Sequence, residues 1–197
     1  MKRNRAAHHL ETLAQTCAGL AANPNPISPL RVRALWAAGE ILEPGAEPEM
    51  ITVALSVDLP PAEVPWRGEP TGAQHWANLT RLSRNPFIPL WRSAQAPVWN
   101  HHIVRPVPVW SAEEGIATDA LTALAEGDLE PFRAEAPSTV DYQARLVEEL
   151  ALCHAALRAA TENYEARRWA PGKLEPHADL LFRSSKGYLE LLAASGR

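Results

Sequence analysis

Two adjacent histidines, His101 and His102, lie in the half of the chain that holds most of its tryptophans and prolines. Either side chain could act as a general acid or base, because imidazole titrates near neutral pH. Indole rings can stack on a planar ligand, and guanidinium groups can hold an oxyanion. We therefore expect a ligand-binding site in region 75–110. Its expected residues are Trp76, Arg92, Trp99, Asn100, His101, His102 and Arg105.

The tryptophans also have a purely structural interpretation. The chain has seven of them but only three phenylalanines and three tyrosines, so indoles are its main large rings. Strands interrupted by proline need large rings to fill an irregular core. Trp36, on an expected buried strand, and Trp169, at an expected helix end, are interpreted as structural. Both interpretations stay open for the other tryptophans, which are Trp66, Trp76, Trp91, Trp99 and Trp110.

The sequence lacks the motifs of common catalytic sites. It contains no H-x-x-x-H, H-E-x-x-H or C-x-x-C pattern, so we expect no metal site. It contains no G-x-S-x-G elbow and no glycine-rich phosphate loop, so we expect neither a hydrolase nucleophile nor a cofactor. Cys17 and Cys153 fall on the apolar stripes of expected helices, which favours buried, reduced thiols over reactive ones.

Length and charge limit the class of protein. A chain of 197 residues can bury one sizeable core, with room for a helical appendage. The net charge of −4 argues against nucleic acid as a partner. No stretch approaches the roughly 18 consecutive apolar residues of a membrane span, and no signal-peptide core follows the basic start. We therefore expect a soluble, cytoplasmic protein with no membrane contact.

The first two thirds of the chain alternate between helical and strand patterns. Apolar residues at three- and four-residue spacing predict a helix that ends at Asn23–Pro26. The start of 32–42 is expected to be a strand buried on both faces. The alternation over 51–59 predicts a neighbouring, half-buried strand. Short helices are expected at 74–83 and 116–126, and further strands at 87–91 and 98–110.

The last third predicts a pair of antiparallel helices. Ser138 with Asp141 resembles a capping box, and it begins a long helix that runs to about Arg168. Pro171 and Gly172 end this helix, and a last helix covers about 176–194. The apolar stripes of both helices must be buried against the sheet, the first helix or another subunit.

The expected fold class is therefore α+β, with a small mixed β-sheet flanked by helices and followed by a C-terminal antiparallel helical hairpin. Proline-containing stretch 130–137 is the best candidate boundary. It divides an α+β domain over 1–130 from a hairpin over 138–197 that packs on it.

Over residues 5–126, the order of helix, strand, turn-rich segment and alternating strand resembles the nucleotidyltransferase superfamily. In that superfamily a Gly-Ser motif follows the first strand, and an Asp-x-Asp pair on the next strand holds Mg²⁺. Here Gly39 and Glu40 lie near the Gly-Ser position, and Met50 and Thr52 replace the two aspartates. Neither replacement can hold Mg²⁺ as a carboxylate does. The resemblance therefore implies a nucleotidyltransferase-like domain with a degenerate active site.

The whole chain is also similar to a family of uncharacterised proteins from high-GC actinobacteria. The fragments that carry this similarity are 72–78, 97–101 and 169–176. This family implies no activity.

Three functional hypotheses follow. The first is a non-catalytic, nucleotidyltransferase-like protein that binds a protein partner or a small molecule. The second is an enzyme of unrecognised type with its site in region 75–110. The third is a structural or assembly protein that self-associates through its C-terminal helices.

Overall fold

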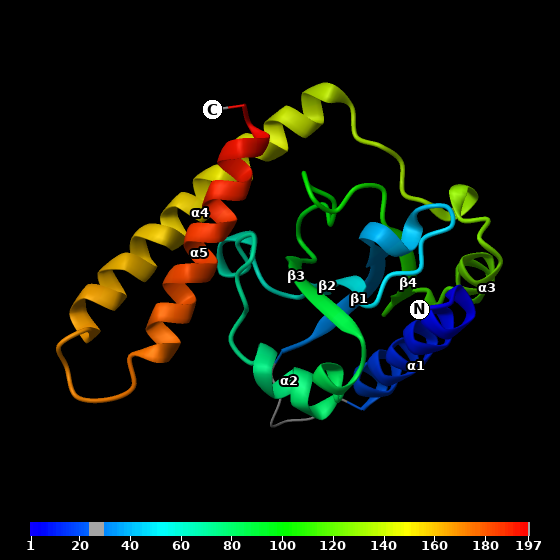
Figure 1. Ribbon diagram of the computed structural model, residues 1–197, viewed down its shortest axis with the longest axis horizontal. Helices are drawn as coiled ribbons and strands as arrows, with labels where there is room; N and C mark the ends of the chain where they lie inside the picture. Colours follow the sequence, from blue (N-terminus) through cyan, green and yellow to red (C-terminus); the bar gives the residue numbers. More distant parts are fainter. Residues whose placement is uncertain (24–29, 197) are drawn as a thin grey trace.

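The computed structural model describes residues 1–23 and 30–196 (Figure 1). The expected helix stop at Pro24 and Pro26 lies outside the described residues. The helices of the described ranges are α1 (Arg3–Ala22), α2 (Ala73–Leu79), α3 (Thr118–Glu126), α4 (Thr139–Arg167) and α5 (Glu175–Ala194). The strands are β1 (Val32–Ala38), β2 (Ile51–Val57), β3 (Phe87–Ser93), β4 (Val107–Ser111) and β5 (Gly115–Ile116).

The strands form one mixed sheet in the order β3-β2-β1-β4-β5. β1 runs antiparallel to both β2 and β4, while β2 and β3 are parallel. The prediction of a small mixed sheet, with the first two strands as neighbours, is confirmed.

Helices cover both faces of this sheet (Figure 1). α1 and α3 pack on one face, and the first core lies between them and the sheet, with Leu10, Leu35 and Val53 among its buried residues. The α4–α5 hairpin lies on the other face, where Trp66 and Leu146 belong to a second core. The predicted α+β class with a C-terminal helical hairpin is confirmed.

The predicted burial of the first two strands is wrong. β2 is buried along nearly its whole length, whereas β1 carries an exposed Arg33 and a half-buried Trp36. Ala54 and Ser56 appeared to face solvent because they alternate with large apolar residues. They are in fact buried, and Ala54 belongs to the second core, because small side chains let the hairpin side pack closely on β2.

The strand predicted over 98–110 is also wrong in its first part, because only β4 is a strand there. The side-chain oxygen of Asn100 accepts the backbone N–H groups of His102 and Ile103, at 2.9 and 2.8 Å. An asparagine that bonds the backbone in this way stabilises a turn rather than a strand. The helix expected over 74–83 is likewise shorter, since α2 ends at Leu79 and only a short 3₁₀ turn follows at Leu82–Arg84.

The hairpin begins as predicted. The Oγ of Ser138 accepts the backbone N–H of Asp141 at 3.1 Å, which is the expected N-cap. Away from this end the hairpin extends past the sheet, and the turn between α4 and α5 lies far from the strands (Figure 1). Trp169, interpreted as structural, is 83% exposed there, because no other element covers the turn.

Two further sequence expectations concern thiols and membranes. Cys17 and Cys153 are both buried and free, as predicted. Within residues 1–23 and 30–196, no helix combines the length and the apolar character that crossing a bilayer requires.

Candidate functional site

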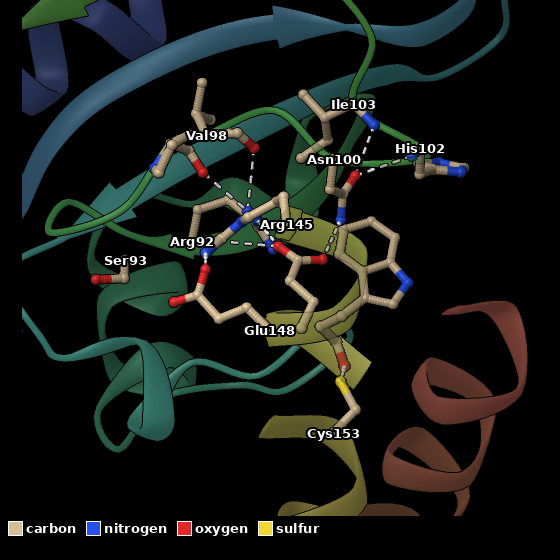
Figure 2. Close-up of polar contacts among 12 residues, drawn as sticks. Arg92, Ser93, Val98, Asn100, His102, Ile103, Arg145, Glu148 and Cys153 are labelled. Carbon is tan, nitrogen blue, oxygen red and sulfur yellow. Dashed lines mark hydrogen bonds and ion pairs between the residues drawn. The ribbon is translucent and has the colours of Figure 1, made fainter. Parts of the chain in front are cut away.

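A buried polar cluster joins β3, the turn after it and α4 (Figure 2). The carboxylate of Glu149 accepts hydrogen bonds from Arg92 and from Asn100, the latter at 3.1 Å, and it forms an ion pair with Arg145 at 2.9 Å. Arg92 also donates to the carbonyl oxygen of Val98 at 3.1 Å. Arg92, Asn100 and Glu149 are each at most 3% exposed, so one carboxylate fastens the sheet and the turn to the hairpin.

The charged side chains of this cluster pair with one another. Burial lowers the pKa of Arg92, and the adjacent carboxylate of Glu149 counteracts that effect. Arg145 is shared between buried Glu149 and exposed Glu148. Removing one partner of a buried ion pair costs about 3–5 kcal/mol, because the other charge is left buried and unpaired. Arg92 and Asn100, both predicted to bind a ligand, thus have buried partners within the fold.

His101 and His102 lie beside this cluster and against the ring of Trp66. Their ring centroids are 5.2 and 5.4 Å from that of Trp66. Burial lowers the pKa of both imidazoles, and for His102 the nearby guanidinium of Arg67 adds to the effect. In the described part of the chain, neither ring nitrogen of His101 has a hydrogen-bond partner. Burial therefore favours the neutral form of both rings, and His101 lacks the carboxylate that would orient a catalytic histidine.

Trp66 forms contacts that join α5 to the segment before α2. Its ring is buried, and its indole N–H donates to Glu190 of α5 at 2.7 Å. Arg67 donates twice to the same carboxylate, at 2.9 and 3.1 Å. Burial opposes ionisation of Glu190, but the hydrogen bonds from Arg67 and Trp66 outweigh it and hold the pKa of Glu190 below its usual value.

The remaining predicted residues lie elsewhere. Trp76 packs edge-to-face on Trp91, at 5.6 Å between centroids, in the first core on the opposite face of the sheet. Arg105 pairs with Glu130 at 2.7 Å, just before α4. Trp99 is half-buried. The structure therefore brings Arg92, Asn100, His101 and His102 together and separates them from Trp76 and Arg105.

Sequence analysis missed Glu149, Arg145 and Glu190. A signal for the first was available, because Glu149 interrupts the apolar stripe that includes Leu146 and Cys153. A carboxylate on a buried helical face needs a partner, so its position predicted a buried cation opposite. Glu190 gave no such signal, since it lies on the half-buried margin of α5.

A separate cavity of about 450 Å³ lies between the second half of α1 and the sheet. Among its lining residues are Cys17, Leu20, Arg31, Arg33, Trp76 and Trp110. Both indoles are at most 3% exposed and form apolar wall, while Arg31 and Arg33 are exposed at the surface. Burial raises the pKa of Cys17 to about 12, so its thiol stays protonated and is a poor nucleophile.

The chemistry available to this cavity is binding. Tryptophan rings suit a planar or apolar group, and guanidinium groups suit an anion. Arg33 already pairs with Glu113 at 2.5 Å, whereas Arg31 forms no ion pair within the described ranges. For metals, residues 1–23 and 30–196 contain no group of three His, Cys, Asp or Glu side chains that could hold an ion.

Comparison with known proteins identifies the family of the chain. A family model described as "Domain of unknown function (DUF7711)" matches residues 1–197. Neither a curated protein nor a solved structure matches the chain.

Proposed function

The chain belongs to the DUF7711 family, and we propose that it is a non-catalytic, nucleotidyltransferase-like protein that binds a small molecule. The ligand has a planar or apolar body and an anionic group. The cavity of about 450 Å³ beside α1 carries this proposal, because its walls include Trp76 and Trp110 and its rim includes two arginines. The described lining residues include no group that titrates near neutral pH, which favours binding over acid–base chemistry.

The degenerate nucleotidyltransferase motif lies at the other end of β1. Gly39 follows β1 and faces Thr52, since a β-carbon on Gly39 would lie 3.4 Å from that of Thr52. The cavity instead lies where β1 begins, beside Val32. A seven-residue strand is about 20 Å long, so the cavity is well separated from the position that the resemblance would assign to a metal. This separation supports a binding role that is independent of nucleotidyl transfer.

The nearby carboxylates cannot replace the missing aspartate pair. Glu49 precedes β2 and Asp58 follows it, so the whole strand separates them. Two-metal catalysis needs ligands around ions only about 4 Å apart. In this proposal residues 1–130 form the nucleotidyltransferase-like domain, and 138–197 form a hairpin packed on it. We place the protein in the actinobacterial cytoplasm without a nucleic-acid partner, as the net charge of −4 favours.

Native mass spectrometry of gently purified protein tests the proposal. We expect one additional small mass per chain, which disappears in an Ala18→Phe variant because the new ring fills the cavity. Ala193→Phe, on the exposed surface of α5, is the matched control and should keep the added mass. Mg²⁺-dependent nucleotidyl transfer that is lost on changing Glu49 or Asp58 would overturn the proposal.

Each of the two alternative functions, an enzyme and a self-assembling protein, is supported by a different observation. An enzyme in region 75–110 is favoured by the proximity of His101 and His102 to Trp66. If the double alanine variant of these histidines retains function, that alternative is excluded. Self-assembly is favoured by the exposed Phe182 and Leu189 of α5. Sedimentation as a monomer at high concentration would exclude it.

A further inference from the structure

A second groove, of about 210 Å³, lies on the hairpin side of the sheet where α5 passes the edge strand β3. Its lining includes Leu90 and Trp91 of β3, Arg67 of the preceding segment, and Phe182, Arg183 and Lys186 of α5. This groove is separate from the cavity beside α1, because the described linings of the two share no residue.

The apolar part of the groove is open to solvent. Phe182 is 67% exposed on α5, and Ile88, which precedes the lining residue Pro89 on β3, is 43% exposed. Phe182 lines the groove, and Ile88 lies next to a lining residue on β3, so exposed apolar surface borders the groove without enclosing it. Such a surface suits a chain segment that enters the groove and continues beyond it.

The free edge of β3 is poorly suited to backbone pairing with an added strand. Pro86 and Ala94 form backbone hydrogen bonds with β2, so alternation turns the nitrogen of Pro89 outward. Proline has no N–H, so an added strand would lack a donor at that position. A partner segment must therefore gain its affinity from the groove walls rather than from continuous strand pairing.

The polar part of the groove carries excess positive charge. Arg67 is held by Glu190, and Arg183 contacts Glu69 at 3.2 Å. Lys186 is exposed and forms no ion pair with any residue that the structure describes. The Nε of Arg183 is buried without a hydrogen-bond partner in the same part of the chain. An incoming carboxylate could pair with the exposed ammonium of Lys186.

We propose that this groove binds an extended acidic segment of a partner protein. An apolar side chain of the segment packs beside Phe182, and a neighbouring carboxylate pairs with Lys186 and Arg183. Arg67, Arg183 and Lys186 outnumber Glu69 in the lining, so the groove complements an acidic partner locally although the chain has a net charge of −4. This inference goes beyond small-molecule binding and does not depend on it.

A random heptapeptide library displayed on phage tests the groove on the full chain. We expect the selected peptides to contain Asp or Glu next to a large apolar residue. Binding of a selected peptide, followed by fluorescence anisotropy, should fall about tenfold or more in Lys186→Glu and in Phe182→Ser. Lys173→Glu, in the exposed turn between α4 and α5, makes the same charge change and should bind like wild type.

Several outcomes would overturn the inference. One is a selected pool without acidic residues, and another is no selection at all. A third is equal loss of binding in Lys186→Glu and Lys173→Glu. Sedimentation that shows a dimer dissociated by Lys186→Glu would make the occupant a second copy of the chain and also overturn it. None of these results alters the small mass expected in the cavity beside α1, so failure of the two proposals can be distinguished.

Discussion

The carbonyl oxygen of Trp66 lies against the α-carbon of Gly187, in the space that a β-carbon on Gly187 would occupy. α5 can therefore approach the segment containing Trp66 only because residue 187 has no side chain. The same approach brings Glu190 to the indole N–H, one helical turn further along. The packing of α5 on the segment that contains Trp66 thus depends on one glycine.

Gly187→Ala should destabilise the protein by about 1–3 kcal/mol, because the methyl group meets rigid backbone and forces α5 outward. Urea unfolding measures the free-energy difference. The matched control is Gly19→Ala in α1, where nothing lies within 4 Å of the added methyl group. Since alanine favours a helix more than glycine does, the control should stabilise by about 0.5–1 kcal/mol. Equal effects at both sites would show that the contact with Trp66 is unimportant.

Glu149→Gln should lower the free energy of unfolding by about 3–5 kcal/mol, because it leaves the buried guanidinium of Arg92 without a counter-charge. Glu148→Gln is the control one residue earlier. The side chain of Glu148 is 55% exposed, so its ion pair with Arg145 contributes only about 0–1 kcal/mol. Chemical unfolding of both variants checks the prediction, and similar losses would contradict the central role of Glu149.

The stability of the protein should fall as pH decreases from about 7.5 to about 5.5. Burial holds the pKa values of His101 and His102 below 6.5, so the unfolded chain binds more protons in this window. The stability from these neutral rings is present above pH 6.5 and is lost as pH falls towards the folded pKa. Glu149 and Glu190 oppose the shift of His101, whereas Arg92 and His102 reinforce it.

Thermal unfolding at several pH values measures this dependence. The double variant His101→Asn with His102→Asn should lose much of the pH slope. His75→Gln, on the exposed side of α2, should keep the wild-type slope. If the double variant retains the full slope, other groups cause it.

Both thiols should be inert in the native protein. Burial raises the pKa of Cys17 and of Cys153 to about 12, so almost no thiolate exists at pH 8. Ellman's reagent should therefore label neither cysteine during the time in which urea-unfolded protein reacts fully. Rapid labelling that disappears in Cys17→Ala would instead show that the cavity beside α1 opens the thiol to solvent.

The sequence contained enough information for the fold class but not for its layers. Periodicity located α1, α4 and α5, and Ser138 marked the start of α4, because these signals are local. β2 is buried on both faces and β1 is partly exposed, the reverse of the prediction, because of where the hairpin packs. Ala54 and Ser56 are small enough to suit either solvent or a close helix, so their types alone could not decide.

The residues of the candidate site were only partly predictable, because some of their partners are distant in sequence. Arg92, Asn100 and the two histidines are neighbours in sequence, so region 75–110 identified them together. Glu149, the common partner of Arg92 and Asn100, comes from a helix at least 49 residues away. Trp76 was grouped with them by sequence proximity, but alternation along β3 places its partner Trp91 on the opposite face from Arg92.

The hydrogen bond between Trp66 and Glu190 spans 124 positions of the chain, and this span matters during synthesis. At about 5–20 residues per second, a ribosome needs roughly 6–25 s to add those residues. The first core can assemble from α1, the sheet and α3 well before then. Trp66 must wait for α5, so a nascent chain carries an unfinished apolar surface until that helix has been made. Chaperones that shield such surfaces are expected to act on the Trp66 side of the sheet.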